Sequence, residues 1–413
     1  MASVRKCAFD LFKKNYLDGD GDEFPFAQWN NNFYSYAKRL ACTFSISNVD
    51  ILSPDDIPAI DESEIKGIIK NDSASLLVFI WGYDKIQTVH DSYKVLAHSN
   101  QKRIQFISVE TLLSKMNSSM KSEKKDFIEG LAIQILAKCD GIPWKLDKDD
   151  ERYKLKPGAL VIGLGFSRPE EGFLVRGAAH FFDQENSLEK FISKSFVIDE
   201  ENVKSLYFPT EVLSQIIQEA TDWYKSQTNR KVSEIYIFKK SALNHRELFA
   251  LIKSGLRWTH IFVKRTSTLH RLFDLANKEE DYEYMVERGL ALVSLPLAEK
   301  MNEVPLTRVD ATLTTTGIYW KLYRDGNYYP FGTLGTPRPL NLEIHSNFDA
   351  DFDSILKLTL ALTKVDWENM DLEYREPTVI KFAQRMADLA YAANRLDNPL
   401  SLQDVNFDVR DLM

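Results

Sequence analysis

The chain has 413 residues, of which 44% are apolar and 12% aromatic, enough for two or three domains with full cores. Its formal net charge of -8 argues against a uniformly basic, phosphate-binding surface but leaves room for a local channel of lysines and arginines. Without a run of about 18 apolar residues or a signal-peptide core, we expect no membrane insertion and a cytoplasmic protein. The scattered Cys7, Cys42 and Cys139 are typical of reduced intracellular thiols.

The first half of the chain alternates between strand-like and helix-like segments. Short apolar runs predict strands, and apolar residues that recur every three or four positions predict helices. This alternation is typical of a parallel sheet covered by helices, so we predict a Rossmann-like α/β domain. The predicted strands are Thr43–Val49, Leu76–Trp81 and Ile104–Ser108, and the predicted helices are Glu62–Ile69, Gln87–His98 and Lys124–Lys138.

Five polar residues on these elements form a candidate anion site. His90 and Lys94 are four residues apart on one predicted helix, so their side chains project from the same side. Gln105 falls in the following strand, while Gln134 and Lys138 lie on the last helix. Lysines supply charge, and amide and imidazole groups supply directed hydrogen bonds, a combination suited to a terminal phosphate. The alternative is that all five are unrelated surface residues.

A charged segment at residues 147–158 divides the chain into two predicted domains, 1–150 and 151–413. The second domain opens with an apolar hairpin, and Asn244 with Glu247 three positions later predicts a capped helix start. The predicted strands are Leu160–Phe166, Phe173–Phe182, Glu234–Lys240, Trp258–Lys264, Gly317–Tyr323 and Pro339–His345. The predicted helices are Glu211–Gln227, Asn244–Lys253, Phe352–Thr363 and Thr378–Asn394.

The order of the five polar residues resembles the MID domain of an Argonaute. In that family a histidine or aromatic residue, a lysine four positions later, a glutamine on the next strand and a lysine on the helix before the PIWI domain hold the 5′ phosphate of the guide. The matching residues are His90, Lys94, Gln105 and Lys138, with Gln134 where some relatives carry a second lysine. The helix exit Ala137–Leu146 (AKCDGIPWKL) is similar to the family's junction between the two domains. The resemblance implies an α/β protein with a Rossmann-like MID domain followed by an RNase H-like PIWI domain.

The resemblance also locates the catalytic positions of a cutting PIWI domain, which uses acidic ligands to hold two divalent metal ions. Those positions are occupied by Gly165, Lys240 and Gln384, none of which is a carboxylate. The resemblance therefore implies a protein that binds nucleic acid without cutting it and is not an enzyme. The alternative is a metal-dependent Argonaute nuclease with non-standard ligands.

Basic residues in the second domain are candidates for contacts with the guide and target backbone. Such contacts position a strand without reading its sequence. The alternative for each residue alone is a solvated basic face. By the resemblance, the terminal carboxylate of Met413 would help to bind Mg²⁺ beside the guide phosphate. The candidate backbone-binding residues are Lys264, Arg265, His270, Arg271, Arg375, Lys381 and Arg385.

The length agrees with short prokaryotic Argonautes, which have MID and PIWI domains but lack N and PAZ domains. The resemblance implies a sensor that binds a short 5′-phosphorylated guide, expected to be RNA with DNA as the alternative, and single-stranded target DNA. Target pairing would activate an APAZ or N-domain-like effector protein in a heterodimer, as antiviral or anti-plasmid defence by abortive infection. A structural α/β protein without a ligand is a further alternative.

Overall fold

The computed structural model divides the chain into two compact units. The first contains Met1–Pro143 and Leu389–Met413, and the second contains Trp144–Asp388. The structure describes residues 2–6, 49–51, 62–71, 76–81, 87–108, 130, 131, 133–135, 137, 138, 146, 154–167, 174–183, 188–197, 207–264, 289–301, 303–315, 321–324, 327–330, 339–365 and 376–393.

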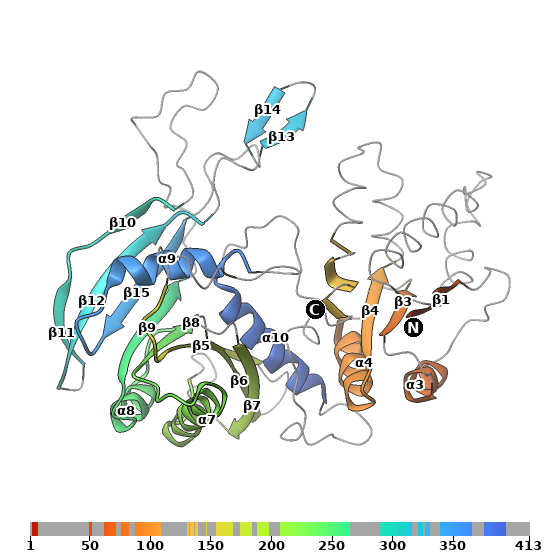
Figure 1. Cartoon of the computed structure of the whole chain (residues 1–413), viewed down its shortest axis with the longest axis horizontal. Helices are drawn as coiled ribbons and strands as arrows, with labels where there is room; N and C mark the ends of the chain where they lie inside the picture. The colour runs from red at the N-terminus through yellow and green to blue at the C-terminus, as the bar shows by residue number, and fades with distance from the viewer. Residues whose placement is uncertain are drawn as a thin grey trace. The chain divides into compact units, whose positions relative to one another are not determined.

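The first unit contains a parallel sheet with the strand order β2-β1-β3-β4. Figure 1 shows β1, β3 and β4 of this sheet beside one another. All three strand pairings are parallel, which confirms the prediction from alternating strands and helices. Apolar residues of the helices and of the last two strands pack together, including Ile69, Leu77, Tyr93 and Ile104. The elements are β1 (Ala2–Lys6), β2 (Val49–Ile51), α3 (Glu62–Asn71), β3 (Leu76–Trp81), α4 (Gln87–Ser99) and β4 (Arg103–Ser108).

The second unit is built on a nine-stranded mixed sheet. Strands β5 (Ala159–Ser167), β6 (Leu174–Asp183) and β7 (Leu188–Val197) form an antiparallel meander. On the other side of β5, strands β8 (Glu234–Lys239) and β9 (Arg257–Lys264) are added in parallel. The order β7-β6-β5-β8-β9 is the RNase H-like arrangement.

The sheet continues beyond β9 with antiparallel strands. Strand β15 (Leu340–Ser346) pairs with β9, and β12 (Val304–Leu313) pairs with β15. Two short strands, β10 (Ala291–Val293) and β11 (Leu297–Met301), pair with successive parts of β12. A separate hairpin joins β13 (Lys321–Arg324) to β14 (Asn327–Pro330).

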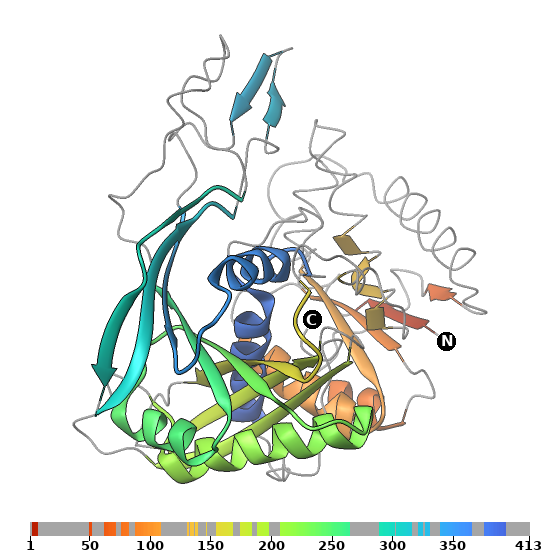
Figure 2. The same ribbon diagram turned by 60° about the vertical axis from the view of Figure 1, so that its left-hand side comes forward.

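Helices cover both faces of the large sheet (Figure 2). Helices α7 (Thr210–Thr228) and α8 (His245–Lys253) pack on one face, where Leu160, Ile162 and Trp258 are buried. Helices α9 (Phe352–Leu362) and α10 (Thr378–Ala393) pack on the other, over a second apolar core of the sheet. Near-continuous apolar strands such as β5 follow from burial on both faces.

Most predicted elements are confirmed to within one or two residues at their ends. The predicted helix 124–138 is helical at each of its described residues, and the predicted strand 43–49 lies mostly outside the described part of the chain. The start of α8 is a capping box as predicted, with Arg246 N donating to Asn244 Oδ1 at 2.9 Å and Asn244 N to Glu247 Oε2 at 3.0 Å. Strands β1, β7, β10 to β12 and β14 were not predicted. In the described segments, no helix is long and apolar enough to cross a membrane.

Candidate nucleic-acid interface

Three of the five predicted phosphate-site residues form one hydrogen-bonded group in the first unit. The ammonium group of Lys138 donates to Gln105 Oε1 at 2.7 Å and to the carbonyl oxygen of Ile104 at 2.8 Å. Gln105 Nε2 donates to Gln134 Oε1 at 2.9 Å. The strand β4 supplies Gln105, and the helical segment that ends near residue 138 supplies the other two. The predicted association of a strand glutamine with the last helix is therefore present in the fold.

This group is held tightly because its central members are buried. Lys138 is 3% exposed and Gln105 is 6% exposed. A nearly buried ammonium interacts strongly with a neighbouring anion because water screens it little. Arg103 Nη1 also donates to the carbonyl oxygen of Lys138 at 2.9 Å, which ties the end of the helical segment to β4. The arrangement provides a preorganised positive charge flanked by amides.

The remaining two members of the predicted set belong to α4. Lys94 is half-buried on that helix. His90 lies one turn earlier on the same helix, and its side chain falls outside the described residues. The i, i+4 relation predicted for this pair is confirmed at the level of the backbone.

In the second unit, Gly165 and Gln384 lie directly against each other. A Cβ atom built on Gly165 would be 2.4 Å from the backbone nitrogen of Gln384 and 2.5 Å from the carbonyl carbon of Ala383. On Gly163 it would be 2.1 Å from the carbonyl oxygen of Val379. Atoms cannot approach this closely, so any side chain at residue 165, an aspartate included, requires the backbone of α10 to move away from β5.

The side chain of Gln384 completes this contact by binding the strand. Its Nε2 donates to the carbonyl oxygen of Phe166 at 2.5 Å, and its Oε1 accepts from the backbone nitrogen of Phe166 at 3.3 Å. The same Nε2 lies 3.1 Å from Asp388 Oδ1, one turn along the helix. A neutral amide satisfies both backbone groups of one residue, which a carboxylate could not do because it has no donor.

Lys240, at the third position that the resemblance assigns to a catalytic ligand, is paired as well. Lys240 directly follows β8, and its ammonium lies 2.5 Å from Glu376 Oε2. The exposed fractions of the two side chains are 32% and 23%, so the pair is partly solvated. Within the described ranges, no group of three or more His, Cys, Asp or Glu residues is arranged to hold a metal ion.

The residue before Lys240 forms a buried ion pair that sequence reasoning did not find. Lys239 is 1% exposed and pairs with Glu247 of α8, which is equally buried. Burial lowers the pKa of Lys239, and the nearby Glu247 carboxylate opposes that shift. Glu247 Oε1 also accepts from the backbone nitrogen of Phe208 at 2.9 Å. The signal in the sequence was a lysine at the end of a mostly apolar strand, followed by a glutamate in a capping position.

A buried histidine pair lies beside this ion pair on the α7–α8 face of the sheet. The register pairs His260 of β9 with His345 of β15, and the ring centroids are 6.4 Å apart. His260 is completely buried, and this burial, together with the charge of Lys239, holds the pKa of His260 well below its ordinary value. It is therefore a neutral core residue near pH 7.

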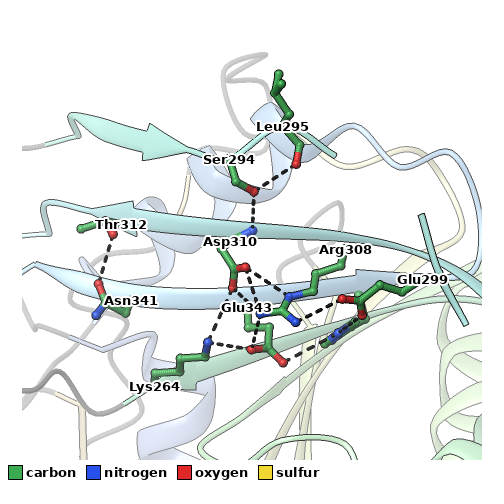
Figure 3. Close-up of polar contacts among 10 residues, drawn as sticks. Lys264, Ser294, Leu295, Glu299, Arg308, Asp310, Thr312, Asn341 and Glu343 are labelled. Carbon is green, nitrogen blue, oxygen red and sulfur yellow. Dashed lines mark hydrogen bonds and ion pairs between the residues drawn. The ribbon is translucent and has the colours of Figure 1, made fainter. Parts of the chain in front are cut away.

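Lys264, predicted to contact backbone phosphates, belongs to an ion-pair network on strands β9, β11, β12 and β15 (Figure 3). Its ammonium lies 2.6 Å from Glu343 Oε2 and 3.5 Å from Asp310 Oδ1. Arg308 contacts the same two carboxylates and also Glu299, at 3.2 Å. The imidazole of His345 also approaches Glu299 and Glu343, at 3.6 and 3.7 Å. A phosphate at Lys264 therefore has to compete with carboxylates already in place.

The structure describes two of the other predicted backbone-binding residues. Lys381 and Arg385 are half-buried and lie one turn apart on α10. Arg265, His270, Arg271 and Arg375, together with Met413, for which a metal-binding role was predicted, lie outside the described residues. Their roles stay predictions.

The strand order and the helices on both faces of the large sheet define a protein with an RNase H-like α/β unit. The sequence model of the Piwi domain family matches residues 76–395, well over half of the chain. The chain belongs to the Piwi domain family. No curated protein sequence matches it.

Among solved structures, that of Clostridium butyricum Argonaute bound to a guide DNA (5′ deoxycytidine) and a 19-mer target DNA is similar. The TM-score is 0.56 at 16% sequence identity, and the similarity covers 98% of this chain and 49% of that chain. The chain thus spans about half the length of that Argonaute, and at this identity the similarity concerns the fold.

Proposed function

We propose that this protein binds a short 5′-phosphorylated guide and a complementary target strand. The observation that carries this proposal is the buried Lys138 with its partners Gln105 and Gln134. These residue types, on these elements and in this order, are those expected to grip a terminal phosphate. The Piwi family match supports the proposal. The similar fold of an Argonaute described as bound to guide and target DNA adds support.

We further propose that the protein binds its target without cutting it. By the resemblance to Argonautes, metal-dependent cleavage would need carboxylates at the positions occupied here by Gly165, Lys240 and Gln384. The close packing of α10 on Gly165 leaves no room for a ligand side chain, and Lys240 would repel a cation. The residues present at these three positions therefore do not fit a two-metal centre.

A sensor that does not cut its target must pass its signal to another protein. We propose an APAZ or N-domain-like effector as that partner, in a cytoplasmic heterodimer of the short prokaryotic Argonaute type. Target pairing would have to favour one of two arrangements of the heterodimer for a signal to result. Mg²⁺ at the guide phosphate, with the carboxylate of Met413, belongs to the same proposal. Antiviral or anti-plasmid defence would be its biological role.

The test measures binding of a guide of about 20 nucleotides with and without its 5′ phosphate, at fixed salt and Mg²⁺ concentrations. Charge-assisted hydrogen bonds contribute about 1.5–3 kcal/mol each, so we expect a preference for the phosphate on the order of 10- to 100-fold. Lys138→Ala and Gln134→Ala should reduce it, and Lys70→Ala, on an exposed position of α3, should not.

Two results would contradict the proposal. Equal affinity of the wild type for guides with and without the 5′ phosphate would exclude the proposed phosphate site. Circular dichroism would show whether a variant had lost affinity because it had lost its fold. Mg²⁺- or Mn²⁺-dependent cleavage of a paired target by the purified protein would favour a nuclease with non-standard ligands. RNA and DNA versions of the guide, compared in the same assay, would decide the guide chemistry.

A further inference from the structure

A groove in the second unit lies apart from all of the residues discussed above. It runs between α7 and the end of α8, and it has a volume of about 390 Å³. Its walls come from α7, from residues 231 and 232 before β8, and from the end of α8 with the turn that follows. Pockets for small ligands range from about 300 to 1,000 Å³, so this groove is suited to a compact ligand.

The rim of the groove is basic although the whole chain is acidic. Lys225, Lys231 and Lys253 line it, all three are exposed, and none forms an ion pair with a described residue. The carboxylate of Asp222 also lines it, and both of its oxygens lie 3.0 Å from Gln218 Nε2. The rim therefore carries a net charge of about +2 in a chain of formal net charge -8. Such a local reversal of sign attracts a small anion.

The floor of the groove is aliphatic. Ile217, Val232, Ala250 and Leu256 provide an apolar surface on which a ring can lie. Inorganic phosphate would leave this surface unused, whereas an anion with a planar organic part would cover it and remove apolar area from water.

An unpaired hydroxyl group in the wall gives an independent indication of a ligand. Ser214 lines the groove, and its Oγ is shielded from solvent and has no hydrogen-bond partner. Buried polar groups in proteins are nearly always paired, so an orphan of this kind calls for an explanation. A change of the Ser214 rotamer would turn this hydroxyl to the groove surface, where a ligand oxygen would supply the missing partner.

We propose that this groove binds a nucleoside diphosphate. The three lysines would surround the two phosphates as point charges, the aliphatic floor would receive the base, and Ser214 would bond to a ligand oxygen. Lysines rather than arginines at the rim fit phosphates without demanding one fixed geometry. An acidic peptide would use the same rim but would gain less from the compact floor. The groove is distinct from the proposed guide site, so either proposal can fail without the other.

The experiment titrates ADP, pyrophosphate and adenosine separately into the full-length protein by isothermal titration calorimetry. We expect saturable 1:1 binding of ADP that is at least tenfold tighter than binding of either fragment and weakens as salt is raised. Lys225→Glu/Lys253→Glu should weaken ADP binding roughly tenfold or more, given that each exposed pair contributes a factor of about two to five. Lys300→Glu is the matched control, because that side chain is 72% exposed on β11 of the same unit.

Ser214→Ala provides a second variant that should not disturb the fold. Its hydroxyl has no partner to lose, so the melting temperature should hold while ADP binds a few-fold more weakly. No saturable ADP binding at millimolar concentration would overturn the proposal. So would equal ADP affinity in the wild type and the double variant, equal affinity for pyrophosphate and ADP, or a hexaglutamate peptide that binds more tightly than ADP. Guide affinity, measured in parallel, should be unchanged in Ser214→Ala.

Discussion

Gly165→Ala should destabilise the second unit although it adds a single methyl group. The new Cβ would lie 2.4 Å from the nitrogen and 2.6 Å from the Cα of Gln384, so the helix backbone itself has to move. Overpacking a closed core costs about 1–3 kcal/mol. A shift of α10 would also strain the two hydrogen bonds between Gln384 and Phe166, each contributing about 0.5–1.5 kcal/mol.

We therefore expect a loss of roughly 2–4 kcal/mol in the free energy of unfolding. For a unit of this size that corresponds to a fall in melting temperature of roughly 5–15 °C. The assay is thermal unfolding followed by circular dichroism, with chemical denaturation as a second measurement of the free energy. Gly67→Ala is the control, because a Cβ there meets nothing within 4 Å and alanine favours the helix α3.

Gly165→Asp should be less stable still and should show no metal-dependent cleavage. A melting temperature of Gly165→Ala within 1–2 °C of the wild type, a span set by the small cost of unstrained substitutions, would refute the packing argument. It would mean that α10 yields easily and that the position could accommodate a ligand side chain.

Two further predictions concern the buried polar groups of the second unit. Lys239→Met should cost about 3–5 kcal/mol by leaving the Glu247 carboxylate buried without its cation, and Lys239→Met/Glu247→Gln should recover part of that loss in urea titrations. In the unfolded chain, His260 has the ordinary histidine pKa of 6.5. In the folded protein its pKa is lowered well below that value, so the ring stays neutral. The unfolded chain alone therefore takes up a proton as the pH falls below 6.5, and stability is lost by up to about 1.4 kcal/mol per pH unit. Denaturant midpoints between pH 8 and pH 5 should show this slope in the wild type and a reduced slope in His260→Leu. A variant with an undiminished slope would assign the effect to other groups.

Local patterns in the sequence were sufficient to predict most of the secondary structure. The strand Leu76–Trp81 has the predicted ends, and the capping box at Asn244 has the predicted partners. These features depend on residues a few positions apart, which is the range over which periodicity and capping act. Strand β7, with charged and apolar residues on both faces, lacks that regularity and was missed.

The parts of the candidate site that depend on the order of elements along the chain were predictable. The parts that depend on contacts between distant residues were not. The association of Gln105 with Lys138 followed from a strand and a helix in a familiar order. The contact of Gly165 with Gln384 joins residues 219 positions apart in the chain, and no local pattern gives its distance. Likewise, the sequence around Lys264 contains no acidic partner for it, but the sheet places Glu343 and Asp310 beside it.

The carboxylate of Glu247 connects three stretches of the chain at one point. It caps α8 through the nitrogen of Asn244, holds the nitrogen of Phe208 just before α7, and binds the ammonium of Lys239 at the end of β8. If any one of these stretches opened to solvent, it would break a hydrogen bond or ion pair of the Glu247 carboxylate. The backbone amides of Phe208 and Asn244, which both donate to this carboxylate, should therefore exchange more slowly than those of the exposed loop around Ala242.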